Sequence, residues 1–253
     1  MTGSLAEKTA AWIAKGGIPL EYEAARALSQ AQFSVAQGES YATESEAGLK
    51  LREIDVVGTL SFETNVTTML VVECKRTTDH PWLVLSNRRQ VDTRGTLEAT
   101  VARAPVRDAV VQAYGRPGGS GIPIHLLPVD RPGFSAVVAL DKEDDDDRNK
   151  ARNAIAQAVS AASGLVDNRQ FDPIVAWPVV VIDGPLLELS YDALGTQEIR
   201  EVPRKRIFWS GVVHGKVAID IVRSNEFHRY ADEAYWGLKD LGARLAAELS
   251  GLR

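Results

Sequence analysis

Two neighbouring apolar stretches in the first third of the chain have the pattern of buried β-strands. The first is expected at about 51–60 and the second at about 67–75, with a tight connection centred near Thr64. Each carries apolar residues on both faces, which is typical of strands inside a protein rather than strands with one face in water. Residues 51–75 are therefore predicted to form an antiparallel hairpin.

Helical spacing of apolar residues predicts four longer helices. The first begins at the capping box Ser4–Glu7, and Leu5, Trp12 and Ile13 are expected to supply its apolar contacts. The last begins at Ser224, and its aromatic residues are interpreted as core packing. The predicted ranges are 5–15, 18–31, 148–163 and 224 onward.

The remaining chain contains shorter strands and connections. Residues 38–48 are interpreted as a polar connection, and 94–113 is helical in composition but is interrupted by Pro105. The acid run 141–147 lacks the glycine and terminal glutamate of a calcium loop, so it is interpreted as complementing the dipole of the next helix. This mixture predicts an α/β fold. Further strands are expected at 82–85 (or a packed loop), 135–140, 174–183, 186–191, 207–213 and 217–223.

The composition fits an ordinary folded protein. The chain has 253 residues, of which 45% are hydrophobic and 25% charged, and this length is enough for one good core. The longest apolar run, 174–182, is too short to cross a bilayer, and the first residues show no secretion signal. A single cysteine, Cys74, excludes an internal disulfide and a cysteine-rich zinc site. A cytoplasmic location without a membrane partner is therefore expected.

Three charged residues lie within the predicted hairpin. Asp55 and Glu73 are each nine residues from Thr64, so they are expected to face each other with Cβ atoms roughly 4.5–5.5 Å apart. Two carboxylates at that separation repel, and a divalent cation is the usual partner for such oxygens. Lys75 shares the face of Glu73 because strand side chains alternate. A lysine there can hold a water beside the metal.

A simpler interpretation of Glu73 and Lys75 is a solvated ion pair of little energetic value. The apolar residues around them disfavour it, because unpaired buried charge is costly. The four histidines are dispersed, and the sequence has no nucleophile elbow or phosphate-binding glycine motif. Asp55, Glu73 and Lys75 are therefore the candidate site.

Positive charge is concentrated in two places although the net charge is −5. Residues 76–116 hold seven arginines against four acidic residues, and Arg204-Lys205-Arg206 is a second basic cluster. Phosphate contacts require local positive charge rather than a basic total. The alternative for any single arginine is a solvated surface position.

The order helix, strand, strand with aspartate, strand with Glu-x-Lys resembles the PD-(D/E)xK nuclease superfamily, and more narrowly its restriction-endonuclease-like proteins of the Mrr type. Asp55 in EIDVVG matches the metal-binding aspartate of the family, and Glu73-Cys74-Lys75 matches its (D/E)xK motif. The proline that precedes the aspartate in the family is replaced by Ile54. The resemblance covers about residues 17–78.

The helix predicted at 18–31 resembles the family helix that supplies a further acid. Here that acid is Glu21, with Glu23 as the alternative. Leu20 replaces the phenylalanine of the family pattern. One domain is expected over residues 1–253, and the resemblance implies that it has a restriction-endonuclease-like mixed β-sheet flanked by helices. Its motif-bearing core is expected at about 17–183, followed by a C-terminal strand–helix extension at about 184–253.

The resemblance implies an endonuclease that depends on Mg²⁺, with Mn²⁺ able to substitute, and that hydrolyses phosphodiester bonds in DNA, as a bacterial restriction or phage-defence effector. Asp55, Glu73 and the helix acid would bind the metal, Lys75 would position the attacking water, and Arg76 and Thr77 would contact the nucleic acid.

Two alternatives remain open from the sequence. The first is a nucleic-acid-binding or assembly module that keeps the nuclease fold without turnover. The second is a nuclease that stays silent until a ligand or partner protein activates it, with 184–253 as a dimerisation or sensor element. A homodimer is compatible with both.

Overall fold

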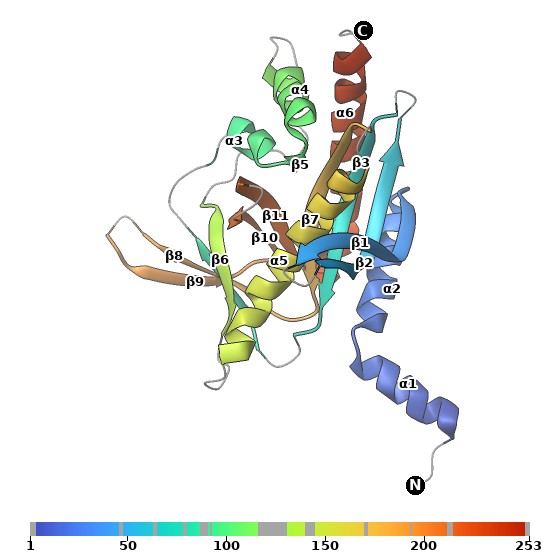
Figure 1. The fold of residues 1–253 in the computed structure, drawn as a ribbon. Coiled ribbons are helices and arrows are strands. Elements are labelled where there is room, and N and C mark those ends of the chain that lie inside the picture. Colours follow the sequence, from blue (N-terminus) through green and yellow to red (C-terminus); the bar gives the residue numbers. More distant parts are fainter. Residues whose placement is uncertain are drawn as a thin grey trace.

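The protein is described by a computed structural model over residues 4–45, 48–62, 65–77, 80–86, 91, 93–115, 131–139, 145–169, 172–192, 194–211 and 215–250. Within these ranges a large mixed β-sheet is flanked by helices, and the chain closes with a long helix (Figure 1). The fold class is therefore mixed α/β.

The helices and strands alternate irregularly along the chain. The helices are α1 (Leu5–Lys15), α2 (Ile18–Gln30), α3 (Thr93–Glu98), α4 (Ala104–Gly115), α5 (Asp145–Asn168) and α6 (Ser224–Ser250). The strands are β1 (Ser34–Ser45), β2 (Gly48–Ser61), β3 (Thr67–Lys75), β4 (Trp82–Ser86), β5 (Val101–Ala102), β6 (Gly133–Val138), β7 (Ile174–Ile182), β8 (Leu186–Tyr191), β9 (Gln197–Glu201), β10 (Arg204–Gly211) and β11 (Gly215–Arg223).

The sheet joins early and late parts of the chain. Its strand order is β1-β2-β3-β7-β11-β10-β6-β4-β8-β9, and β5 pairs with β7. In the middle, β3, β7 and β11 are parallel, and β7 is buried along its whole length, as is usual for parallel strands covered on both faces. Pro178 lies between the residues of β7 that pair with β5 and those that pair with β11, so the residue without an N–H falls where the neighbour changes.

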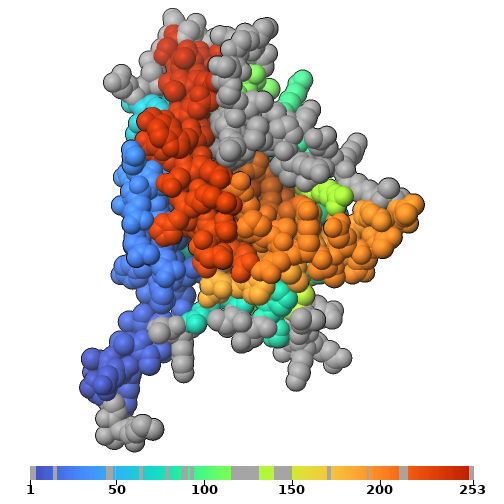
Figure 2. All heavy atoms as spheres, turned by 180° about the vertical axis from the view of Figure 1, so that it is seen from behind, coloured from blue at the N-terminus to red at the C-terminus, as the bar shows by residue number. Residues whose placement is uncertain are grey.

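Two hydrophobic layers cover the two faces of the sheet. Val71 of β3 belongs to the layer under α5, whereas its neighbour Val72 belongs to the layer under α2, α4 and α6, because successive side chains of a strand point to opposite faces. From behind, α6 runs along α2 over the second face (Figure 2). The rings of Phe33 and Tyr235 meet there edge to face, with centroids 5.8 Å apart.

The helices predicted at 18–31 and from 224 onward are confirmed, and their apolar residues at helical spacing are buried. In α2 and just after it these are Leu20, Ala24, Ala27, Leu28 and Ala31, and in α6 they are Phe227, Tyr230, Ala231, Ala234, Leu238, Leu241 and Leu245. The aromatic residues of α6 are core packing, as expected. The last helix thus belongs to the same core as the first half of the chain.

The first helix is confirmed in extent but not in its contacts. Ser4 and Glu7 form the predicted capping box, with the Glu7 N–H donating to Ser4 Oγ at 3.2 Å. However, Leu5 and Trp12 are 82% and 69% exposed, so the prediction that they pack is wrong. In Figure 1 this helix extends away from the rest of the molecule.

Three further sequence predictions are corrected. The polar connection expected at 38–48 is mostly strand: β1 continues to Ser45 and pairs with β2, and an edge strand of this kind needs few apolar residues. The stretch 94–113 divides into α3, β5 and α4, with Pro105 in the first turn of α4. The strand β9 was missed because all of its residues are exposed and leave no apolar pattern.

Some predicted features fall outside the described residues. These are the connection at Thr64, most of the acid run 141–147, and Arg88, Arg89 and Arg116 of the first basic stretch. In the described ranges no helix is both long and apolar enough to span a membrane.

Candidate functional site

The predicted hairpin brings Asp55 to the strand that carries Glu73. The β2–β3 pairing runs from Ser61↔Thr67 to Val56↔Val72, and one further step of this register places Asp55 opposite Glu73, as predicted. At this point Asp55 Oδ2 accepts a hydrogen bond from the backbone N–H of Cys74 at 2.7 Å. The side chain of Asp55 therefore takes the place of a strand-to-strand bond, which fixes its carboxylate at the end of the ladder.

Glu73 and Lys75 form a close pair at the end of β3. Lys75 Nζ lies 2.6 Å from Glu73 Oε1, and the two side chains are 36% and 9% exposed. The carboxylate is thus almost buried, while the ammonium reaches the surface. This is not the solvated pair of the simpler interpretation, because its acid has little access to water.

The helix α2 supplies a third carboxylate. Glu21 lies in its first turn, after Gly17 at the N-cap and a proline in the first positions, and it is half-buried. Burial raises the pKa of Glu21, and the charges of Asp55 and Glu53 raise it further, whereas Lys75 acts in the opposite direction. Glu21 therefore lies within electrostatic reach of the site. Glu23 is exposed, so Glu21 is the better candidate of the two helix acids.

The acids at this site share a single ammonium group. Burial raises the pKa of Asp55, and a hydrogen bond from Cys74 and the charge of Lys75 only partly oppose this. Burial also raises the pKa of Glu73, as do the charges of Asp55 and Glu21, against the lowering effect of Lys75. Negative charge is thus in excess at the end of β3, and one more cation would stabilise the ionised acids.

Glu53 is a fourth acid that the sequence analysis did not single out. It is exposed, and its charge raises the pKa of both Glu21 and Asp55. Its position two residues before Asp55 in a strand is the signal that could have identified it, because residues at that spacing tend to share a face.

Arg76 and Thr77, the predicted nucleic-acid contacts, follow Lys75 directly. Arg76 Nε lies 3.3 Å from Asp183 Oδ2, and the N–H of Thr77 donates to Asp183 Oδ1 at 2.6 Å. Asp183 follows β7, so the two strand ends are tied together. The next residue, Gly184, has no room for a side chain, since a Cβ there would lie 2.0 Å from Thr77 Oγ1.

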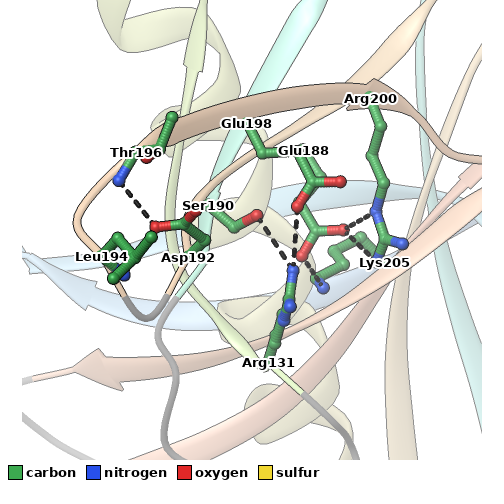
Figure 3. A network of polar contacts seen from close by, with 9 residues as sticks. All are labelled: Arg131, Glu188, Ser190, Asp192, Leu194, Thr196, Glu198, Arg200 and Lys205. Carbon is green, nitrogen blue, oxygen red and sulfur yellow. Dashed lines mark hydrogen bonds and ion pairs between the residues drawn. The ribbon is translucent and has the colours of Figure 1, made fainter.

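The second basic cluster does not form a basic surface in the structure. Each member pairs with an acid: Arg204 with Glu233, Lys205 with Glu188, and Arg206 with Asp220. The side chains of Lys205 and Arg206 are almost buried. Figure 3 shows Glu188 between Lys205 and Arg200, beside a second set of contacts around Arg131. The sequence could not reveal these pairings, because the partners come from other strands and from α6.

The donor types at the site fit a hard divalent cation such as Mg²⁺. Carboxylate oxygens are the preferred protein ligands of this ion, and Glu21, Asp55 and Glu73 come from three separate elements with unbalanced negative charge. Within the described ranges, no group of three His, Cys, Asp or Glu side chains has the geometry to hold a metal ion. Glu73 is paired with Lys75, and Asp55 accepts a hydrogen bond from the Cys74 N–H. Metal binding would therefore require at least one of these carboxylates to move.

Comparison of the chain with protein-family models, with curated proteins and with solved structures gives no match.

Proposed function

We propose that the protein is a metal-dependent endonuclease that hydrolyses phosphodiester bonds of nucleic acid, with DNA as its substrate. The observation that carries the proposal is the contact of Glu73 with Lys75 at 2.6 Å, with Asp55 and Glu21 within electrostatic reach of that pair. A restriction or phage-defence role is the biological setting that the family resemblance suggests, and it rests on that resemblance alone.

The acids would hold magnesium, which supplies positive charge that polarises the scissile phosphate when bound. Asp55 is held in place by the Cys74 N–H, so little order has to be gained at that ligand. Lys75 is partly exposed, and its ammonium can donate a hydrogen bond to the attacking water and orient it toward phosphorus. Burial of Glu73 strengthens its electrostatic interaction with any cation, because the local dielectric constant is low.

The test is incubation of plasmid and single-stranded DNA with the protein, with Mg²⁺ or with excess chelator. Glu73→Ala and Lys75→Ala are expected to reduce the cleavage rate by about a thousandfold or more, the scale for removing a group that stabilises charge in a transition state. Glu21→Gln should also reduce the rate, whereas Glu23→Gln, its matched control on the same helix, should not. Cleavage that persists in chelator, or that survives either alanine substitution at a near-normal rate, would contradict the proposal.

The second candidate is a nucleic-acid-binding or assembly module without turnover. One observation favours it: the described part of the chain has no three metal ligands already in place. This candidate requires binding of nucleic acid that is indifferent to divalent metal and is followed by no cutting. A nuclease that needs an activator would also fail to cut, but it would still bind Mn²⁺.

A further inference from the structure

A cavity of about 470 Å³ lies beside Lys75, where α5 crosses the ends of β3, β4 and β6. Ligand-binding cavities commonly have volumes of about 300–1,000 Å³. Filled with liquid water at about 30 Å³ per molecule, this cavity would hold on the order of 15 waters. It is therefore far larger than a site for one structural water, and it can hold a small molecule or one unit of a polymer.

The walls of this cavity carry positive charge. The cations Lys75, Arg76 and Lys150 line it, and no Asp or Glu is among its lining residues in the described ranges. Lys75 and Arg76 each pair with an acid outside the lining, Glu73 and Asp183. A concave surface lined by one sign of charge concentrates ligands of the opposite sign. Because Lys75 belongs both to the cavity and to the acidic site, an anion bound at this end would lie next to the proposed reaction centre.

Three residues that line the cavity each have a buried polar atom without a hydrogen-bond partner in the described part of the chain. These atoms are Thr77 Oγ1, Trp82 Nε1 and Gln157 Oε1. Trp82 is only 1% exposed, so its N–H has no easy access to bulk water. Native proteins leave few buried polar groups unpaired, and each such group calls for an explanation, such as a functional role or a bound water or ion.

The three atoms differ in what they require. The indole N–H of Trp82 can only donate, the amide oxygen of Gln157 can only accept, and the hydroxyl of Thr77 can do either. The apolar remainder of the wall includes Val138 and Ala154. Donors and acceptors set in an apolar wall suit the edge and the flat faces of a nucleobase, which enzymes of nucleic acids read in this way after taking it out of the stack.

We propose that this cavity binds one unstacked nucleotide, with its phosphate at the cationic side near Lys75 and Lys150 and its base against Trp82 and Gln157. This inference rests on the proposed nuclease function. It narrows the substrate to nucleic acid in which a nucleotide can leave the base stack. Single-stranded DNA, or duplex with an extrahelical base, is then bound better than intact duplex.

The test is a calorimetric titration of the full chain with nucleoside 5′-monophosphates in excess chelator, so that the acidic site contributes no metal. Inorganic phosphate and the free nucleosides are the comparison ligands. At least one monophosphate should bind at least about tenfold more tightly than either of its parts, since the two halves of the cavity hold different parts of the molecule.

Two variants localise the binding. Lys150→Ala, an exposed position on α5, should weaken binding of the nucleotide by about tenfold, and Gln157→Leu should weaken it while leaving binding of inorganic phosphate unchanged. Arg152→Ala is the matched control: it removes the same charge from the same helix, but Arg152 lies over the ring of Trp209, 5.9 Å from its centroid. If Gln157→Leu fails to fold by circular dichroism, the Lys150 and Arg152 pair still decides.

The inference is overturned if no monophosphate binds, if phosphate alone binds equally well, or if Arg152→Ala weakens binding as much as Lys150→Ala. These outcomes are separate from those of the cleavage test. Binding of a nucleotide without any metal-dependent cutting would support the cavity and count against the nuclease. Metal-dependent cutting without nucleotide binding would support the nuclease and count against the cavity.

Discussion

Two groups of buried carboxylates in this protein have opposite electrostatics. Burial alone would raise the pKa of Asp220, but the charge and hydrogen bonds of Arg206, with bonds from Tyr230 and Trp177, lower it. Glu188 likewise has a lowered pKa because hydrogen bonds led by that from Lys205 outweigh its burial. At the end of β3, by contrast, Asp55 and Glu73 have raised pKa values.

The difference lies in how completely each acid is matched. Arg206 binds Asp220 through two hydrogen bonds of 2.8 Å, and its guanidinium lies 4.8 Å from the ring centroid of Trp177, so every charge there has a partner. At the other site, three acids share Lys75. Where each buried acid has its own basic partner, the ion pairs hold the strands together. Where acids outnumber basic groups, a bound cation would stabilise the site. Perturbed acids of the second kind are candidates for function.

The largest expected effect is a difference in the free energy of unfolding between substitutions in the two groups of acids. Asp220→Ala leaves Arg206 buried without its anion, and the loss of one partner of a buried pair costs about 3–5 kcal/mol. Glu73→Ala removes an acid that its neighbours repel, so the free energy of unfolding should change far less. Urea denaturation of both variants measures this contrast. Equal destabilisation by the two substitutions would show that the acidic site is an ordinary structural network.

A smaller effect concerns pH. A carboxyl with a raised pKa in the folded state contributes stability that is full below its unfolded pKa and is lost as the pH rises through the folded value. Relative to wild type, Glu73→Gln should therefore become progressively more stable as the pH rises above the ordinary value of 4.5. Asp220, with a lowered pKa, contributes stability that is present above its ordinary value of 3.8 and is lost at lower pH.

Relative to wild type, Asp220→Asn should lose less stability as the pH falls below 3.8, the ordinary pKa of aspartate. The free energy of unfolding should be measured from pH 3 to pH 7 for wild type and both variants. The difference between variant and wild type, plotted against pH, should then have slopes of opposite sign for the two variants. Slopes of the same sign would mean that the two groups of acids are not electrostatically distinct.

Much of the local structure could be predicted from the sequence because it depends on neighbouring residues. The period of the apolar residues located β3, α2 and α6, and counting from Thr64 gave the register in which β2 and β3 pair from Val56↔Val72 to Ser61↔Thr67. Long-range pairing could not be predicted in this way. Nothing near Arg204, Lys205 and Arg206 indicates that each would meet an acid from another element, so a triplet that looks basic in sequence is neutral in space.

The candidate site shows the same limit. The two strand acids and Lys75 could be found from spacing, but the choice between Glu21 and Glu23 needed the packing of α2 against the sheet. The cavity beside Lys75 combines residues from β3, β4, β6 and α5, which are separated by long stretches of chain. Its unpaired polar atoms have no signature in the sequence at all.

The central claim is that the acids at the end of β3 hold a divalent cation. Titration of the protein with Mn²⁺, followed by calorimetry, tests it without requiring activity or an activator. Wild type and Glu23→Ala are expected to bind the ion alike, whereas Asp55→Ala should lose the binding. A wild-type protein that binds no Mn²⁺ at millimolar concentration, or binding that Asp55→Ala leaves unchanged, would contradict the account.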